Sequence, residues 1–223
     1  MDKNKQTHIM TKLQKCAKAL EANNMQTFIA KDADDARRIA KDLLSDCNTV
    51  TMGGSMTAAE CGIPDLLRSG DYTFYDRSVP GLTPDEITDI YRKAFTCDAY
   101  ISSSNAITEN GELYNVDGNS NRVAAMLYGS KKLIVIAGYN KIVKNIDAAI
   151  KRVREQAAPP NCLRLGLDNY CTHTGNCIAS DKGGDMCAGC NSESRICCNY
   201  VVMSRQRMKD RVKVILVAEE LGY

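Results

Sequence analysis

Apolar positions along this chain follow two alternating spacings, one typical of helices and the other of strands. Helical spacing runs from Lys5 to Ala22 and again from Asp32 to Leu44. Beside these segments, the short apolar runs Met25 to Ala30 and Thr49 to Met52 predict strands. The chain therefore opens with a helix and then alternates strand with helix.

The same alternation continues through the middle of the chain. Short strands are predicted at Tyr72 to Tyr75 and at Asp98 to Ser103. Ser55 to Arg68 suits a helix as far as Pro64, because proline interrupts a helix. The run Leu133 to Ala137 is entirely apolar, which is typical of a strand that is buried on both faces of a sheet.

Three further helices are predicted from their starts and their apolar stripes. Thr83-Pro84-Asp85-Glu86 is a strong start, since Thr83 can cap the helix and Glu86 completes a capping box. The next helix follows Gly118 to Ser120, and Asn140 is predicted to cap the third. The apolar stripes are, in order, Ile87, Ile90, Tyr91, Ala94 and Phe95; Val123, Ala124, Met126 and Leu127; and Ile142, Val143, Ile146, Ala149, Ile150 and Val153.

Turn residues and two late strands complete the predicted fold. Asn110-Gly111 predicts a hairpin turn, and Pro159-Pro160 is expected to close the series. Further strands are predicted at Tyr200 to Met203 and at Val212 to Val217. The whole pattern predicts one α/β domain over residues 1–223, with a mostly parallel twisted sheet and helices on both faces.

Composition and charge exclude some function classes. The 29 basic and 27 acidic residues give a net charge of +2 and are interspersed, so no footprint for nucleic acid stands out. No stretch approaches the ~20 apolar residues of a membrane span. Residues 1–20 also lack the continuous apolar core of a signal peptide. We therefore expect a soluble cytoplasmic protein without a nucleic-acid or membrane partner.

The turns after the predicted strands are the expected binding site, because ligands of parallel sheets bind beyond the carboxyl ends of the strands. Gly53-Gly54-Ser55 would present backbone N–H groups at a helix start. Arg122 and Lys141 fall in predicted first helical turns, where a cation opposes the helix dipole unless an anion or a carboxylate lies beside it. This pattern predicts a site for phosphate or carboxylate. The alternatives are cations that face solvent and glycines that serve only a tight turn.

Two carboxylates near these turns are candidates for acid–base or nucleophilic chemistry. Glu60 follows the Gly-Gly-Ser turn, and Glu109 lies beside the predicted hairpin turn. Each of them could equally be an exposed surface residue. The chain has only two histidines, His8 and His173, and no Ser-His-Asp or Cys-His arrangement is proposed.

The eleven cysteines are the most unusual feature of the composition. A reducing cytosol keeps thiols free, so a disulfide network is not expected and metal binding becomes the leading interpretation. Seven cysteines lie between Cys162 and Cys198, which marks residues 161–199 as a cysteine-rich metal-binding segment. The other four are scattered and are expected to be small buried hydrophobic residues: Cys16, Cys47, Cys61 and Cys97.

The spacing of the seven late cysteines suits metal ligation. Four thiolates can hold a tetrahedral zinc ion or an iron–sulfur cluster, and the two-residue gap between Cys187 and Cys190 suits either. Inert reduced thiols and a redox-active dithiol pair are the open alternatives. His173 is expected to be an incidental loop residue rather than a ligand.

Four stretches of the chain resemble the motifs of the LUD family, which is named for lactate utilisation. Their order within residues 5–160 agrees with the family, and the motifs add Asn105, Asn119 and Asn121 to the predicted ligand-binding residues. The stretches are Met52-Gly-Gly-Ser-Met-Thr-Ala-Ala-Glu-Cys-Gly-Ile63, Ser104-Asn-Ala-Ile-Thr-Glu-Asn-Gly-Glu-Leu113, Asp117-Gly-Asn-Ser-Asn-Arg122 and Ala137-Gly-Tyr-Asn-Lys-Ile-Val143.

The resemblance extends to the late cysteines. Their spacing is similar to the Cys-x5-Cys-x2-Cys-x6-Cys extension of one LUD subgroup, which ends in Arg-Ile-Cys. This implies Cys171, Cys177, Cys190 and Cys197 as metal ligands, with Cys187 as an alternative. Here the residues from Ala179 to Met186 enlarge the gap after the second cysteine, so the choice of ligands stays open.

The resemblance implies a fold and partners, and the sequence leaves three hypotheses about function. The expected sheet is that of the sugar-isomerase and CoA-transferase superfamily, and the expected partners are iron–sulfur proteins that oxidise lactate to pyruvate. The first hypothesis is a subunit or accessory protein of lactate (2-hydroxy acid) utilisation that binds an anionic metabolite and a metal centre. The second is a stand-alone acyl- or CoA-transferring enzyme, because Glu109-Asn110-Gly111 is similar to the nucleophile of CoA-transferases. The third is a zinc-stabilised interaction module without catalysis.

Overall fold

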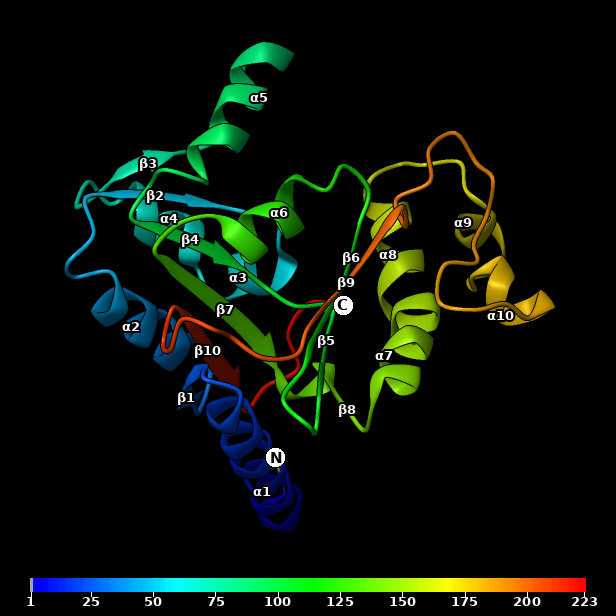
Figure 1. Cartoon of the computed structure of the whole chain (residues 1–223), viewed down its shortest axis with the longest axis horizontal. Helices are drawn as coiled ribbons and strands as arrows, with labels where there is room; N and C mark the ends of the chain where they lie inside the picture. Colours follow the sequence, from blue (N-terminus) through cyan, green and yellow to red (C-terminus); the bar gives the residue numbers. More distant parts are fainter. Residues whose placement is uncertain (1) are drawn as a thin grey trace.

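The computed structural model describes residues 2–223 and contains a six-stranded sheet in which every neighbouring pair of strands is parallel (Figure 1). The order across the sheet is β1-β10-β7-β4-β2-β3. This confirms the predicted α/β class and mostly parallel sheet. Its strands are β1 (Gln26–Ala30), β2 (Thr49–Met52), β3 (Thr73–Tyr75), β4 (Ala99–Ser102), β7 (Lys132–Gly138) and β10 (Val212–Val217).

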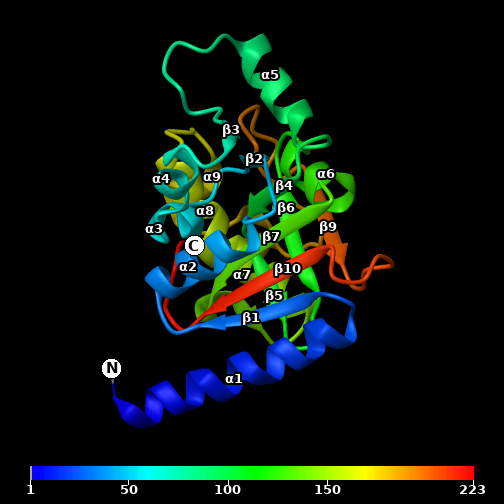
Figure 2. The same cartoon turned by 90° about the vertical axis from the view of Figure 1, so that its left-hand side faces the viewer.

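Both faces of this sheet are covered, so its central strands are buried on both sides. In β7, Leu133 and Val135 pack into the core on the side of α1, whereas Ile134 and Ile136 pack into the core on the side of α2. The long helix α1 lies across β1 and β10 at the edge of the molecule (Figure 2). The helices around the sheet are α1 (Lys3–Ala22), α2 (Ala33–Leu43), α3 (Met56–Glu60), α4 (Ile63–Arg68) and α6 (Asn121–Tyr128).

A second, four-stranded sheet packs on the side of α1, in the order β8-β5-β6-β9. β5 and β6 form the predicted hairpin, in which Gly111 adopts a positive φ of 80°. β9 pairs antiparallel with β6 and returns the chain from the cysteine-rich segment. The strands are β5 (Ala106–Thr108), β6 (Leu113–Asp117), β8 (Ile142–Val143) and β9 (Asn199–Met203).

The predicted helix start at Asn140 is wrong. Tyr139–Lys141 forms a single 3-10 turn, η1, and Ile142–Val143 pairs with β5 as strand β8. The helix α7 (Ile146–Arg152) begins later because Asn145 caps it, with its side chain accepting a hydrogen bond from the Ala148 N–H at 3.0 Å. Lys141 therefore does not lie at a helix N-terminus.

Pro64, which was expected to end a helix, begins one instead, and so do Pro159 and Pro160, which were expected to close the strand–helix series. Pro64 lies in the first turn of α4. Gly62, the residue before this helix, has a left-handed backbone with a φ of 65°. Pro159 and Pro160 lie at the start of α8 (Ala158–Arg164), which follows the π-helical turn η2 (Val153–Ala157). A proline lacks the backbone N–H that the first turn of a helix leaves unpaired, so the start of a helix tolerates it.

The helix α5 (Pro84–Lys93) begins as predicted, with the capping box between Thr83 and Glu86. Its apolar stripe is only partly buried: Ala94, just beyond the helix, is buried as expected, but no residue within the helix is buried and Phe95 is 43% exposed. Figure 1 shows α5 projecting away from the body of the molecule. In α6, Val123 and Met126 are buried as predicted, whereas Leu127 is exposed.

The cysteine-rich segment follows α8 and lies on the far side of the second sheet from α1, in yellow and orange in Figure 1. It contains two short helices, α9 (Tyr170–Thr174) and α10 (Ile178–Lys182). Within residues 2–223, every helix is too short or too polar to cross a membrane.

Candidate functional site

A cavity of about 490 Å³ opens beyond the carboxyl ends of β2, β4 and β7, where parallel sheets bind their ligands. Its walls also take in the start of α6, the helices η2 and α8, and the end of the cysteine-rich segment. We call it the strand-end cavity. Its polar and charged lining residues are Ser55, Arg77, Ser103, Ser104, Asn105, Asp117, Asn119, Asn121, Arg122, Lys141, Asn161, Arg164, Glu193, Ser194, Arg195, Cys197 and Tyr223.

The two glycines after β2 leave room for side chains of the cavity wall. A Cβ atom on Gly53 would lie 2.7 Å from the Tyr100 hydroxyl and 3.3 Å from Cγ of Arg122. A Cβ atom on Gly54 would overlap the guanidinium group of Arg77. Neither glycine has a positive φ, so close approach explains them better than turn geometry does. Ser55 caps α3, with its hydroxyl accepting a hydrogen bond from the Ala58 N–H at 3.1 Å.

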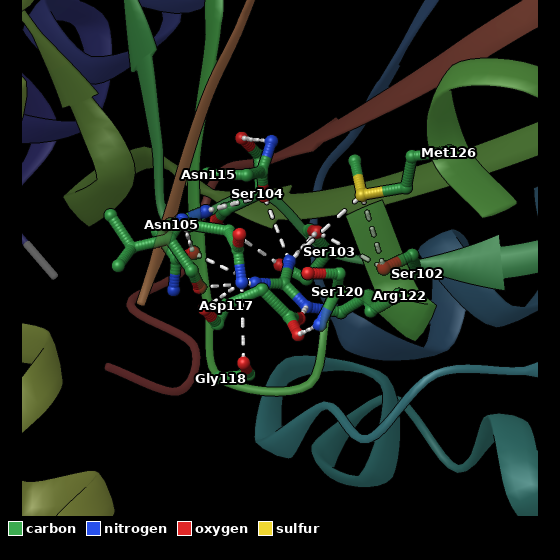
Figure 3. A network of polar contacts seen from close by, with 12 residues as sticks. Ser102, Ser103, Ser104, Asn105, Asn115, Asp117, Gly118, Ser120, Arg122 and Met126 are labelled. Carbon is green, nitrogen blue, oxygen red and sulfur yellow. Dashed lines mark hydrogen bonds and ion pairs between the residues drawn. The ribbon is translucent and has the colours of Figure 1, made fainter. Parts of the chain in front are cut away.

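Arg122 is held in a network of hydrogen bonds inside the wall (Figure 3). Its Nε donates to Asp117 Oδ2 at 3.0 Å, and Nη1 donates to Asn115 Oδ1 at 2.8 Å. Its Nη2 donates to Asn105 Oδ1 at 3.0 Å and to the Val116 carbonyl at 2.7 Å. The carboxylate beside Arg122 is thus Asp117, so this arginine shapes the wall without requiring an external anion.

Lys141 is a buried cation without such a partner. Lys141 is only 3% exposed, and its Nζ donates a hydrogen bond to the Ser103 hydroxyl at 3.2 Å. Among residues 2–223, no carboxylate lies within salt-bridge distance of Lys141. Burial and the charges of Arg152 and Arg122 lower the pKa of Lys141 to about 7.

Arg152 fixes the turn that carries Lys141. Its Nε donates to the Asn140 carbonyl at 3.0 Å, and its Nη1 donates to the Asn105 carbonyl at 2.7 Å. These two bonds tie η1 to the serine-rich loop after β4. Burial lowers the pKa of Arg152 to about 10, yet at neutral pH it stays charged.

The strand-end cavity brings together seven of the eight predicted ligand-binding residues. Gly53 lies beneath the wall, and the other seven line the cavity: Gly54, Ser55, Asn105, Asn119, Asn121, Arg122 and Lys141. Sequence reasoning missed Ser103, Arg77 and Arg152. Ser103 could have been found, because it directly follows a buried strand at its carboxyl end.

The two predicted catalytic glutamates lie outside the cavity lining. Glu109 is in the β5–β6 turn, where its Oε2 accepts a hydrogen bond from Lys15 Nζ at 2.7 Å. This bond lowers the pKa of Glu109. Glu60 is exposed at the end of α3, and its Oε2 accepts a hydrogen bond from the Gly222 N–H at 2.7 Å.

Five cysteines of the late segment lie near one another, and we call them the thiol cluster: Cys162, Cys171, Cys177, Cys190 and Cys197. The sulfur atoms of Cys171 and Cys162 are 3.6 Å apart. Burial and the charges of Cys177, Cys162 and Cys171 raise the pKa of Cys197 to about 12. Sequence reasoning missed Cys162, which α8 brings to the cluster.

The other late cysteines and His173 lie outside this cluster. Cys187, the alternative ligand, is exposed, and so is Cys198. His173 is exposed and pairs with Asp168. Within residues 2–223, no three Cys, His, Asp or Glu side chains are arranged around one position that would hold a metal ion. The four scattered cysteines are all buried, as predicted.

Arg195 connects the thiol cluster to the strand-end cavity. Its guanidinium group donates to the carbonyls of Cys187 at 3.0 Å, Cys190 at 3.1 Å and Cys197 at 2.7 Å. Arg195 and Cys197 both line the cavity. The cysteine-rich segment therefore forms part of the cavity wall.

Comparison with known proteins was made by sequence and by structure. The family model described as LUD domain matches residues 13–217. A search of curated proteins found no match. A crystal structure of a DUF162 family protein from Deinococcus radiodurans is similar, with 12% identity and a TM-score of 0.51, over 96% of this chain and 98% of that one.

A second solved structure, the tetrameric eIF2B-beta2-delta2 complex from C. thermophilum, is 15% identical over 60% of this chain and 42% of that one. Its TM-score of 0.30 is too low to support an argument. The Deinococcus structure agrees with the fold over nearly the whole of both chains. The match covers most of the sequence, and its residues span the four motifs. The chain belongs to the LUD domain family.

Proposed function

We propose that this protein serves lactate utilisation by binding a small 2-hydroxy or 2-oxo carboxylate in the strand-end cavity. Membership of the LUD domain family supports a role related to lactate utilisation in general terms. The observation that carries the proposal is Lys141, a buried cation that faces the cavity and forms no salt bridge with a described residue.

The charge balance of the lining favours an anionic guest. Five cationic side chains line the cavity, against the carboxylates of Asp117 and Glu193. Asp117 is already paired with Arg122. Burying a cation without a counter-charge is costly, so a carboxylate bound beside Lys141 would recover part of that cost.

The size and polarity of the cavity suit a small metabolite. Cavities that bind small molecules commonly range from roughly 300 to 1,000 Å³, and this one is about 490 Å³. The Ser103 hydroxyl lies 3.2 Å from Lys141 Nζ, and Asn105 lines the same cavity, so both can orient a hydroxyl or carbonyl group of a guest. A short hydroxy acid would fill only part of the space, which leaves room for water or for a larger conjugate.

The proposal is tested by the unfolding temperature of the protein in the presence of L-lactate and of pyruvate. Both acids are expected to raise the unfolding temperature, because a ligand that binds only the folded state stabilises it. The Lys141→Met variant should lose this response, whereas Lys144→Met, at an exposed lysine nearby, should keep it. Equal responses in both variants, or none in the wild type, would contradict the proposal.

A second proposed feature is a zinc ion or iron–sulfur cluster at the thiol cluster. The donor set supports it: soft sulfur ligands gather in a partly buried place, where burial and the neighbouring thiols raise the pKa values of Cys171 and Cys197. A bound metal would reverse that effect and keep the thiolates ionised. Cys162, Cys171, Cys177 and Cys197 would hold it, with Cys190 as the fifth candidate.

Metal analysis and absorption spectra of anaerobically purified protein test this second feature. Iron with absorption in the visible range would indicate a cluster, and stoichiometric zinc would indicate a structural site. Cys171→Ser should lose the metal, whereas Cys47→Ser should retain it, since Cys47 is a buried cysteine beneath α2 and α4. Absence of metal from both the wild-type protein and Cys47→Ser would rule the metal site out.

The rival hypothesis is a stand-alone acyl- or CoA-transferring enzyme that uses Glu109 or Glu60. Because both glutamates lie outside the cavity lining, the geometry favours the binding role over this one. Thioester turnover by the purified protein that disappears in Glu109→Gln would favour the rival. Association with iron–sulfur proteins that oxidise lactate stays a prediction, as does a cytoplasmic location.

A further inference from the structure

We infer that Lys141 is a nucleophile whose Nζ condenses with the carbonyl group of a small oxo acid in the strand-end cavity to form a reversible imine. The inference deepens the proposed function and rests on it, because it requires an oxo acid to enter this cavity. The chemical class of the ligand is a short carboxylic acid that carries an aldehyde or ketone group.

The amine of Lys141 is held in a defined place beside the cavity. Lys141 lies in the short turn η1 between β7 and β8, and Arg152 ties this turn to the loop after β4. The side chain is buried, yet it lines the cavity, so a guest reaches the amine only through that space. A covalent amine catalyst needs this combination of a fixed position and a closed approach.

The charges around the amine favour its neutral form. Arg152 approaches from α7 and Arg122 from α6, and both oppose protonation of Lys141. Glu60 and Cys61, from the end of α3, act in the opposite sense but do not form a salt bridge with it. Enzymes activate lysine nucleophiles by desolvation and by a neighbouring cation, and Lys141 has both.

A hydroxyl group that can relay protons lies next to the amine. The Ser103 hydroxyl accepts a hydrogen bond from Lys141 Nζ at 3.2 Å and donates to the Ser104 carbonyl at 3.4 Å. It is buried at the carboxyl end of β4 and lines the same cavity. A hydroxyl in this place can pass protons between the nitrogen and the oxygen of a carbonyl guest.

These groups allow imine formation with all atoms accounted for. The neutral amine adds to the carbonyl carbon, and the resulting carbinolamine passes a proton from nitrogen to oxygen through Ser103. The carbinolamine oxygen then leaves as water, and a C=N bond remains. No oxidant or second reactant is needed. Arg77 lines the cavity, forms no salt bridge with a described residue and can bind the carboxylate of the guest.

The experiment is reductive trapping with pyruvate as the probe. The protein is incubated with pyruvate and sodium cyanoborohydride, and the adduct is located by intact-mass measurement and peptide mapping. One adduct per chain is expected, on Lys141. L-lactate has no aldehyde or ketone group and should give none. Lys141→Arg should abolish the adduct, Lys144→Arg should not, and Ser103→Ala should slow its formation by about tenfold or more.

The pH dependence of trapping separates an activated lysine from an ordinary one. Because only the neutral amine adds to a carbonyl, the trapping rate at Lys141, measured well below saturation with pyruvate so that it reports the free protein, should rise with pH and level off above its pKa of about 7. A rate that keeps rising toward pH 10, the range of an unperturbed lysine, would overturn the inference.

Pyruvate binding, measured by calorimetry on the same preparation, separates failure of the imine from failure of the proposed binding function. Pyruvate that binds without a trapped adduct, or an adduct spread over many lysines, overturns the imine and leaves the proposed binding function intact. Absence of binding by both lactate and pyruvate overturns the imine together with the proposed function.

Discussion

At the scale of single residues, the strand-end cavity depends on two adjacent glycines that perform different tasks. Gly53 lies against the buried Tyr100 and the stem of Arg122, whereas Gly54 lies against the mobile end of Arg77. Gly53→Ala should therefore lower the free energy of unfolding by about 1–3 kcal/mol, because it overpacks a buried contact. Gly54→Ala should leave stability nearly unchanged and weaken lactate binding by displacing Arg77. Urea unfolding and ligand titration of both variants check this contrast, and equal stability of the two would contradict it.

The ion pair between Asp117 and Arg122 should stabilise the folded protein. Asp117→Asn keeps the shape of the side chain but removes the charge that balances Arg122 within the wall. Loss of about 3 kcal/mol in the free energy of unfolding is expected, because breaking a buried ion pair leaves one charge uncompensated. Asp89→Asn is the matched control, since Asp89 pairs with Arg92 on the exposed surface of α5. A similar loss in both variants would show that the wall network has no special importance.

At the scale of elements, the periodic patterns predicted nearly every helix and strand of the main sheet. The errors arose where contacts between residues far apart in the sequence determine the local structure. Asn140 and Asn145 both resemble caps, and the choice between them depends on the pairing of Ile142–Val143 with β5, which no local pattern reveals. Cys162 was missed for the same reason, because its helix rather than its spacing brings it to the thiol cluster.

The exposed helix α5 should contribute much less to the free energy of unfolding than the buried strand β7. Ile87→Ala, in the unburied stripe of α5, should change the free energy of unfolding by less than about 1 kcal/mol. Ile134→Ala in the centre of β7, which is fully buried, should lower it by about 2–5 kcal/mol. Urea unfolding measures both. A large loss for Ile87→Ala would mean that another surface covers α5 in solution.

At the scale of the whole molecule, Lys141 links folding to pH. Its pKa is about 7 in the folded state and near 10.4 in an unfolded chain, so between these values the unfolded state binds more protons. Stability should therefore rise with pH across this interval. The buried thiols titrate in the opposite sense, and the wild type must be compared with Lys141→Met to cancel them. If the difference between the two unfolding curves does not change with pH, Lys141 is not perturbed.

An anion that binds beside Lys141 should be accompanied by the uptake of a proton, which can be measured. At about pH 8 the free amine is mostly neutral, and a bound lactate carboxylate should raise its pKa and draw in a proton. Calorimetric titration of L-lactate in buffers of different ionisation enthalpy should show this uptake in the wild type and not in Lys141→Met. Binding without proton uptake, or the same uptake in both proteins, would contradict the account.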